Sequence, residues 1–252
     1  MIMKISYISD LHLDFYVRMD KKSGQKTPAF LTTLLPEEKG EILVIAGDIS
    51  HYNGQSFFAL QFFSTIFEQV IFVLGNHDYY LISGNQQKKY HRKSREREAE
   101  LYNMISQLPN VKLLTQFERF QYKDVSFAGA TNWYALADFK EQQFFKTISN
   151  DSALIKGIDI QAMNHLEMEA YQHLQEVDVL ITHVPPIIID THRAHNSTAC
   201  YLNELPDINA RVCIFGHCHE QKLYEKAGIR FCINALGYPD EKLPLKIRTF
   251  SL

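Results

Sequence analysis

The chain has 252 residues, of which 46% are hydrophobic and 22% charged, and its formal net charge is −3 at pH 7. These values are typical of a globular protein, and 11 Gly with 8 Pro are too few for a collagen-like or disordered chain. Because 26 Lys and Arg nearly balance 29 Asp and Glu, no strong positive field attracts polyanions, which argues against a general nucleic-acid-binding protein.

The four cysteines and the N-terminus indicate in which cellular compartment the protein is expected. All four cysteines lie in the last quarter of the chain and form no CxxC pair. The N-terminal residues lack a basic segment followed by a long apolar stretch, and no window approaches the roughly 18 apolar residues of a membrane span. We therefore expect a cytoplasmic protein with no membrane partner.

Short apolar runs rich in β-branched residues recur along the chain, and each ends abruptly in polar residues. In chain order the five clearest runs cover residues 4–9, 42–46, 70–74, 177–181 and 212–215. Apolar runs of this length are typical of strands that are buried on both faces of a sheet. Further strands are expected at residues 111–114, 125–128, 229–233 and 245–250, the last two as a hairpin.

Helical patterns occupy segments between these runs. A helix capped by Ser56 is expected where Ala59 and Phe63 recur at helical spacing, and a second one over residues 163–174. Strands that alternate with helices predict an α/β layered fold, which we expect to be a single domain over residues 1–252.

Residues 83–108 stand apart because they are rich in charge. Between positions 88 and 97 the segment holds six basic residues: Lys88, Lys89, Arg92, Lys93, Arg95 and Arg97. One interpretation is a solvated helix face with charge pairs, which such runs usually form. The other is a helical cap or insert within the domain that brings positive charge over an anionic substrate.

Seven residues with metal-binding side chains follow the ends of the apolar runs: Asp10, His12, Asp48, Asn76, His183, His217 and His219. In α/β sheets, sites form where loops leave the carboxyl ends of strands. Carboxylate and imidazole ligands suit Mn, Fe, Zn or Ni better than a cysteine-rich structural zinc site does. Seven ligands are too many for one tetrahedral ion and fit two ions that share a ligand, roughly 3.5–4 Å apart as in many phosphoryl-transfer sites.

The spacing within two of these motifs predicts how the ligands converge. In Asp10-x-His12 and His217-x-His219, a locally extended backbone would place both side chains of each pair on the same side. The intervening residue, such as Cys218, would then turn away from the metals.

Each motif alone is common by chance, but the ordered set at the ends of separate strands is specific. The set comprises Asp10-x-His12, Gly47-Asp48, Gly75-Asn76-His77-Asp78, Thr182-His183 and Gly216-His217-x-His219. Over about residues 4–235 it resembles the calcineurin-like metallophosphoesterases, and residues 129–134 resemble a segment of small, single-domain bacterial phosphohydrolases of that superfamily. The resemblance implies a four-layered αββα sandwich with two central mixed β-sheets.

The resemblance also implies a dinuclear centre of two divalent ions. One ion would be held by Asp10, His12, Asp48 and His219. The other would be held by Asp48, Asn76, His183 and His217, so that Asp48 bridges the two. A hydroxide shared by the ions would then attack the phosphorus of a phosphomonoester or phosphodiester substrate.

Three residues near these ligands receive roles by the same resemblance. His77 looks like the general acid that protonates the leaving alcohol, because an imidazolium titrates in a suitable range. Asp78 either orients a ligand histidine from behind or caps a helix after the turn. His51 either helps to position His77, contacts the substrate, or is a surface loop residue.

The residues after Gly47-Asp48 distinguish between branches of the family. In protein Ser/Thr phosphatases the motif continues into an Asp-Arg-Gly whose Arg grips phosphate, whereas here it continues Ile49-Ser50-His51, which argues against a phosphoprotein phosphatase. A histidine at position 51 is also found in the DNA-repair exonuclease branch. The alternative function is therefore a nuclease acting on single-stranded or end-containing nucleic acid, which predicts a basic groove beside the metals.

A catalytically silent metal-binding scaffold is the alternative outside the enzymes, although the intact His77 and ligand set argue against it. Two further sets of residues bear on a substrate pocket. Trp133 and Tyr134 either wall the pocket or pack in the core, and core packing is favoured for Trp133. A separate set, His192, His195 and Asn196, follows His183 in the chain and is a candidate to reach the substrate.

Overall fold

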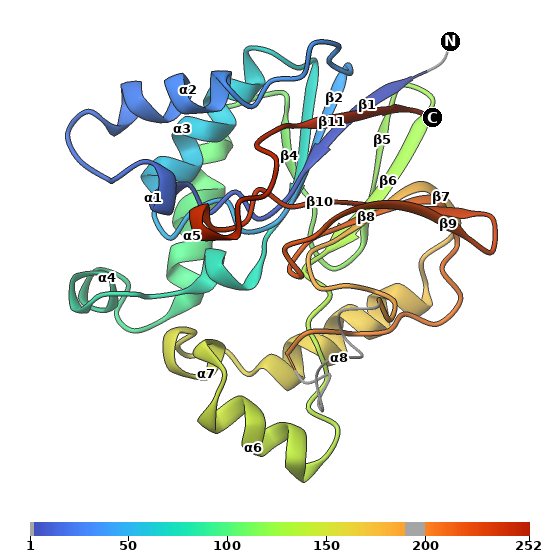
Figure 1. The fold of residues 1–252 in the computed structure, drawn as a ribbon. Coiled ribbons are helices and arrows are strands. Elements are labelled where there is room, and N and C mark those ends of the chain that lie inside the picture. The colour runs from blue at the N-terminus through green and yellow to red at the C-terminus, as the bar shows by residue number, and fades with distance from the viewer. Residues whose placement is uncertain (1–2, 190–199) are drawn as a thin grey trace.

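The arrangement of layers is that of an αββα sandwich. The structure, a computed structural model, describes residues 3–189 and 200–252. Two mixed β-sheets pack face to face, and helices cover both outer faces (Figure 1). The predicted fold class, a four-layered sandwich with two central mixed sheets, is confirmed.

The first sheet has the strand order β11-β1-β2-β3-β4. Its strands are β1 (Lys4–Ile8), β2 (Ile42–Ala46), β3 (Gln69–Val73), β4 (Val111–Leu113) and β11 (Arg248–Ser251). Strands β1 to β4 are parallel, and β11 is antiparallel to β1. In β2, Leu43 and Ile45 face the helices whereas Val44 and Ala46 face the second sheet, so every residue of the strand is buried. Burial on both faces explains the continuous apolar runs in the sequence.

The second sheet has the order β5-β6-β7-β8-β10-β9. Its strands are β5 (Glu118–Tyr122), β6 (Val125–Ala130), β7 (Val177–Thr182), β8 (Ala210–Phe215), β9 (Gln221–Lys226) and β10 (Ile229–Asn234). The four central strands are parallel, and the edge strands β5 and β9 are antiparallel to their neighbours. The expected hairpin between the strands near 229 and 250 is wrong, because β10 pairs with β9 while β11 joins β1 in the other sheet.

The helices divide between the two outer faces. The α-helices are α1 (Leu13–Tyr16), α2 (Ser23–Thr32), α3 (Asn53–Ser64), α4 (Gly84–Lys89), α5 (Ser94–Ile105), α6 (Phe139–Thr147), α7 (Asn150–Leu154) and α8 (Ile160–Gln172). The 3₁₀ helices among the described residues are η1 (Asn76–Tyr79) and η3 (Pro239–Glu241). Figure 1 shows α2, α3 and α5 outside the first sheet and α8 outside the second, with α6 and α7 beyond the sheets.

The helix expected to start after Ser56 begins earlier. Tyr52, with an extended backbone, is the N-cap residue of α3, and the hydroxyl of Ser56 is buried inside the helix without a hydrogen-bond partner. The predicted cap at Ser56 is therefore wrong. No side chain caps α3, and the side-chain oxygen of Asn53, its first residue, accepts a hydrogen bond from Arg97 instead.

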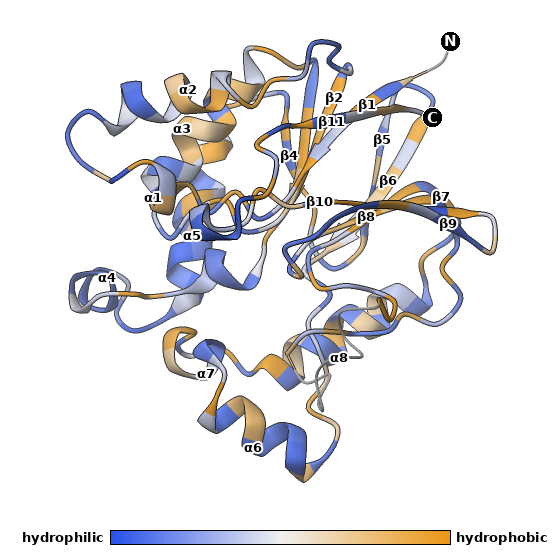
Figure 2. Ribbon diagram, in the orientation of Figure 1, coloured by the Kyte–Doolittle hydropathy of each residue, from blue (hydrophilic) through white to orange (hydrophobic). Residues whose placement is uncertain are grey.

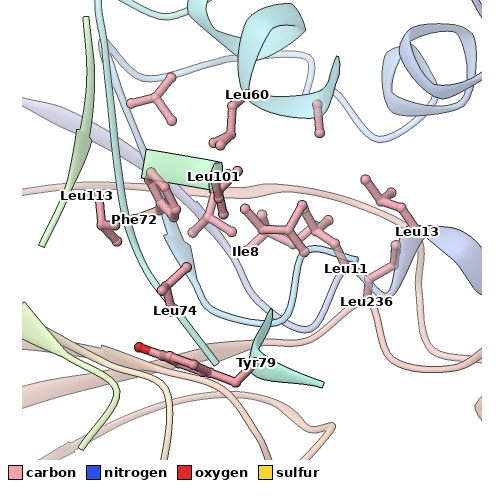
Figure 3. Packing of buried hydrophobic residues seen from close by; sticks show 14 of the residues in the cluster. Ile8, Leu11, Leu13, Leu60, Phe72, Leu74, Tyr79, Leu101, Leu113 and Leu236 are labelled. Carbon is pink, nitrogen blue, oxygen red and sulfur yellow. The ribbon is translucent and has the colours of Figure 1, made fainter. Parts of the chain in front are cut away.

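One hydrophobic core joins the first sheet to its helices (Figure 3). Ile8 of β1 and Phe72 of β3 pack there with Leu60 of α3 and Leu101 of α5. Leu11, in the loop after β1, is also fully buried in this core. A buried leucine in the middle of the loop fixes the position of the polar residues on either side of it.

The basic segment at residues 88–97 is divided between α4 and α5, which Figure 2 shows to be largely hydrophilic. Lys89 pairs with Glu100, and Arg95 pairs with Glu98. Arg97 is different, because it is buried and donates hydrogen bonds to the carbonyls of Ser50, His77 and Tyr80. Among the residues described, no helix has the length and apolar character that crossing a membrane requires.

Candidate metal centre

Loops at the carboxyl ends of parallel strands bring the seven predicted ligands together. Asp10 and His12 follow β1, Asp48 follows β2, Asn76 follows β3, His183 follows β7, and His217 and His219 follow β8. Their side-chain atoms are linked by N···N and N···O distances between 3.0 and 3.7 Å. The centre therefore joins one edge of the first sheet to the corresponding edge of the second.

Five of the seven predicted ligands have a left-handed backbone. The φ angles are 50° at Asp10, 41° at His12, 57° at Asp48, 69° at His217 and 47° at His219. The locally extended backbone expected for the two short motifs is therefore wrong. Such conformations cost on the order of 1–3 kcal/mol for a residue with a side chain and gather at functional sites, where the surroundings impose them.

The first group of ligand atoms is formed by Asp10, His12 and His219. The Nε2 atoms of His12 and His219 lie 3.0 Å apart. His219 Nε2 is also 3.7 Å from Asp10 Oδ1. The Asp10 carboxylate is held in place by the Ser9 hydroxyl at 2.5 Å and by the backbone N–H of His217 at 2.9 Å.

The second group is formed by Asp48, Asn76, His183 and His217. His183 Nε2 lies 3.0 Å from Asn76 Oδ1, 3.1 Å from His217 Nδ1 and 3.3 Å from Asp48 Oδ2. Asp48 Oδ2 is also 3.7 Å from His12 Nε2. The Asp48 carboxylate thus faces both groups.

Backbone and carboxylate acceptors fix which ring nitrogen of three histidines faces the centre. His183 donates from Nδ1 to the carbonyl of Ala46 at 2.9 Å, and His217 donates from Nε2 to the carbonyl of Cys200 at 2.7 Å. His219 donates from Nδ1 to Glu241 at 2.8 Å. In each case the other nitrogen is directed at the neighbouring ligands, as is typical of metal-binding histidines.

These donor atoms fit divalent ions. Two ligands that each lie about 2.1 Å from an ion are separated by roughly 3.0–3.4 Å at tetrahedral or octahedral angles, which matches the closest distances in both groups. The donors are carboxylate oxygens, one amide oxygen and imidazole nitrogens, which suit Zn, Mn, Fe or Ni. The residues present therefore fit a metal centre.

The electrostatics of the second group depend on Asp48 and His183. Burial would raise the pKa of Asp48, but the charge of His183 holds that pKa well below its usual range. Burial lowers the pKa of His183, but the charge of Asp48 outweighs it and raises the pKa to about 9. A cation bound at this position would take the place of the proton on His183, so binding releases that proton.

Two glycines permit the close approach of the carboxylates. A Cβ on Gly75 would collide with the carboxylate of Asp48. A Cβ on Gly216 would lie 2.6 Å from Asp10 Oδ2. Any larger residue at position 75 or 216 would therefore displace a ligand carboxylate, which explains why these two motif positions are glycine.

Asp78 supports the backbone of the centre. Its carboxylate accepts the N–H groups of Gly75 at 2.9 Å, Asp48 at 2.9 Å and Ile49 at 3.2 Å. The N-cap residue of η1 is Gly75, so Asp78 is not the cap itself but lies inside the helix and accepts the N–H of the cap residue. The other two bonds position Asp48 rather than a ligand histidine. Burial, reinforced by the charge of Asp48, raises the pKa of Asp78 to about 6.

His77 belongs to a hydrogen-bonded chain of three side chains. Its Nδ1 lies 2.9 Å from His51 Nε2, and His51 Nδ1 lies 2.8 Å from Asp14 Oδ2. Of the three roles considered for His51, the structure places it against His77, and the residue is buried rather than on the surface. Burial lowers the pKa of His77 to about 4. The sequence reasoning missed Asp14, although it stands only two positions after His12.

Asp151 in α7 is a second residue that the sequence reasoning missed. It is buried, and it accepts hydrogen bonds from Asn76 Nδ2 at 2.8 Å and from the hydroxyls of Tyr80 and Tyr134. By binding the amide nitrogen it turns Asn76 Oδ1 towards His183. No motif marks Asp151, which is 75 positions from Asn76 in the chain.

A cavity of about 440 Å³ opens onto the centre. Its lining includes the candidate ligands Asp48, Asn76, His217 and His219 together with His77. Cys218, which was expected to turn away, also lines this cavity. His217 and His219, on either side of Cys218, have left-handed backbones. The alternation of side chains in an extended strand therefore does not apply there.

The remaining predicted pocket residues differ in placement. Trp133 is fully buried in the core beside Tyr79, with ring centroids 5.3 Å apart, so the interpretation as a core residue is correct. Tyr134 is also buried and reaches the centre only through Asp151. His192, His195 and Asn196 lie outside the described residues.

Comparisons with known proteins agree with this geometry. The sequence model of one family, described as calcineurin-like phosphoesterase, matches residues 3–221. An uncharacterized protein, L509, of Acanthamoeba polyphaga mimivirus is 28% identical over 273 aligned positions, which cover 94% of this chain and 92% of that protein.

Two solved structures share the fold. The phosphopantetheinyl hydrolase of Mycobacterium tuberculosis has a TM-score of 0.71 at 18% identity, covering 98% of this chain and 95% of that one. The protein TT1561 of Thermus thermophilus has a TM-score of 0.53 at 10% identity, covering 99% of both chains. At these identities the likeness establishes the architecture and leaves the substrate open.

Proposed function

The chain belongs to the calcineurin-like phosphoesterase family of metal-dependent phosphoester hydrolases, and we propose that it hydrolyses a phosphomonoester or a phosphodiester with two divalent ions. The observation that carries this proposal is the pair of ligand groups that meet at Asp48. Two ions bound side by side would share that carboxylate, and they supply Lewis-acid activation of water and neutralisation of phosphoryl oxygens.

We assign the ligands as follows. One ion would be held by Asp10, His12 and His219, whose ligand atoms form one cluster, together with Asp48, whose Oδ2 lies 3.7 Å from His12 Nε2. The other is held by Asp48, Asn76, His183 and His217. We propose Mn, Fe, Zn or Ni as the ions, because the mixed oxygen and imidazole donors suit all four.

His77 is proposed to protonate the leaving alcohol. It lines the cavity, and its Nδ1 is occupied by His51, so Nε2 is the nitrogen left for the substrate. The free protein holds this ring neutral, because burial lowers its pKa to about 4. A phosphate anion beside the ring would raise that pKa and favour the protonated form at the moment it is needed.

A nuclease is the less favoured enzyme function. It requires a basic groove beside the centre, and the described residues that line the cavity include no Lys or Arg. Arg97 of the basic segment is buried and bound to backbone carbonyls instead. A small phosphate ester therefore fits the cavity better than a nucleic-acid strand.

We further propose that residues 1–252 form one domain in the cytoplasm. Residues 83–108 would be an integral helical part of it rather than a mobile cap, since Arg97, Leu101 and Ile105 are buried. The described cysteines are all free, which suits a reducing compartment.

The test is metal-dependent turnover. The protein is stripped with a chelator, reloaded separately with each of the four ions, and assayed on bis(4-nitrophenyl) phosphate, 4-nitrophenyl phosphate, nucleotides and single-stranded DNA. A phosphopantetheinylated protein is added because one structural neighbour is a phosphopantetheinyl hydrolase. Metal-dependent hydrolysis of small esters is expected. Binding of two ions without hydrolysis of any compound would favour the silent scaffold, and preferential cleavage of DNA would favour the nuclease.

A further inference from the structure

The cavity beside the metal centre has one apolar side. Helix α6 has no buried residue, yet it carries three phenylalanines, and Ile148 follows directly after it. Ile148 is 66% exposed and lines the cavity together with the partly buried Phe144. Single exposed apolar residues are ordinary on protein surfaces, but these two face the space in which a substrate must lie.

This apolar side continues towards the metal centre through Tyr201. The ring centroid of Phe144 is 6.2 Å from that of Tyr201, which is 6.1 Å from that of His217. Tyr201 also lines the cavity. A row of rings therefore leads from a candidate metal ligand to α6.

The position of this apolar side is fixed relative to the proposed metal ligands. Asp151 of α7, which follows α6 after two residues, binds the amide of Asn76 and the hydroxyls of Tyr80 and Tyr134. Ser149 caps α7 by accepting the N–H of Asp151 at 3.2 Å. The apolar side chains are thus held at a set distance from the atoms that would bind phosphate.

Two carboxylates that line the cavity, those of Asp151 and Glu241, already have hydrogen-bond partners. Asp151 has the three partners named above, and Glu241 accepts from His219 Nδ1 and from the N–H of Tyr238 at 2.7 Å. The lining residues that the structure describes offer no cation for a second phosphate or carboxylate, which needs Arg or Lys. A volume of about 440 Å³ is within the range of small-molecule pockets.

We propose that Phe144, Ile148 and Tyr201 bind the alcohol part of the substrate, which is therefore a phosphate ester of an uncharged and largely apolar alcohol. This inference rests on the proposed function, because it assumes that the phosphate lies at the metal centre. It adds a selectivity element in a segment, residues 139–154, that supplies no proposed metal ligand.

The test compares two esters of primary alcohols that are similar in length. Hexyl phosphate and 2-(2-methoxyethoxy)ethyl phosphate differ in the polarity of the chain. Metal-loaded protein should hydrolyse the hexyl ester with a kcat/KM about 10-fold higher, the range for a few apolar contacts in a pocket. Ile148→Ser should remove most of that preference, because it should lower kcat/KM for the hexyl ester more than kcat/KM for the ether. Leu166→Ser, an exposed leucine of α8 outside the cavity, is the matched control and should keep the preference.

Binding gives a second readout that does not depend on turnover. Calorimetry with hexylphosphonate, which cannot be hydrolysed, should show about 10-fold tighter binding than the ether phosphonate, and Ile148→Ser should abolish the difference. Equal binding of both phosphonates, or equal loss of both in the variant, would overturn the inference even if the protein is a phosphoesterase. Selective binding without hydrolysis of any ester would instead overturn the proposed function and leave the apolar pocket standing.

Discussion

Two regions of the molecule meet at the cavity and are built differently. The metal edge consists of the loops after β1, β2, β3, β7 and β8. The wall consists of residues 139–154. At the metal edge, Asp10, Asp48 and His183 are essentially inaccessible to solvent, and each of them has fixed hydrogen-bond partners. In the wall, α6 buries no residue, and Ile148 is largely exposed.

This difference indicates how the tasks of the site are divided. Buried, fully bonded ligands tolerate little change, because removing one partner leaves another polar group buried and unpaired. Exposed apolar residues can change at little cost in stability, since their neighbours do not depend on them. We infer that the metal edge determines the reaction, whereas the wall determines which ester reacts.

The largest effect is expected from Asp48→Asn at the metal edge. Both proposed ions lose their shared negative ligand, so occupancy of both should fall, and turnover should drop by more than about 10⁴-fold, beyond the range for loss of a general acid alone. Elemental analysis at limiting metal measures the occupancy. Asp124→Asn, an exposed residue of the β5–β6 turn, is the control. Loss of only one ion would show that Asp48 is not a bridge.

His77→Asn should separate proton donation from metal binding. Turnover of an alkyl phosphate should fall by about 10²–10⁴-fold, because its alkoxide cannot leave without a proton. A nitrophenyl ester, with a better leaving group, should lose much less, and metal content should be unchanged. His165→Asn in α8 is an exposed control. An equal loss for both esters would exclude the role of His77 as the acid.

The metal edge could be predicted from the sequence because its signal is local and repeated. Each ligand follows an apolar strand within a few residues, and parallel strands bring such ends to one edge of a sheet. The backbone conformation there could not be predicted. Asp10 and His12 have positive φ angles because Leu11 between them is buried in the core, which is a tertiary constraint.

The edge strands, the residues that support the ligands and the wall left no comparable signal in the sequence. The edge strands β5 and β9 are rich in charge and lack the apolar runs of the central strands, so they were missed. Asp151 contacts Asn76 across 75 positions of sequence, and no spacing rule connects them. A role for an exposed residue such as Ile148 can be inferred only when the cavity beside it is known.

Asp151→Asn tests the point where the wall touches the metal edge. The new amide would place an N–H₂ group against that of Asn76 or the hydroxyl of Tyr134, so Asn76 should lose its orientation. Affinity for the ion at Asn76, His183 and His217 should fall about 10–100-fold, as for other residues that orient a ligand. Excess metal should restore turnover. Ser152→Ala, on the same helix, should change neither affinity nor turnover.

The last prediction concerns stability rather than turnover, and it is expected at Glu167. This carboxyl group in α8 is 3% exposed and accepts the N–H of Trp133 at 2.7 Å. Burial raises its pKa to about 8. Between the unfolded pKa near 4.5 and the folded pKa near 8, the folded state holds a proton that the unfolded state has lost. Its contribution to stability is therefore complete below pH 4.5 and is lost as the pH rises towards 8.

Glu167→Gln removes this titration. The free energy of unfolding of the unsubstituted protein should fall across pH 5–8 with a contribution of up to about 1.4 kcal/mol per pH unit from this group. The variant should show a flatter profile, whereas Glu169→Gln, at an exposed position of the same helix, should not. Urea unfolding at several pH values measures both. Ile148→Ser should leave the whole profile unchanged, because the Ile148 side chain is largely exposed; a parallel shift would show that this residue also contributes to stability.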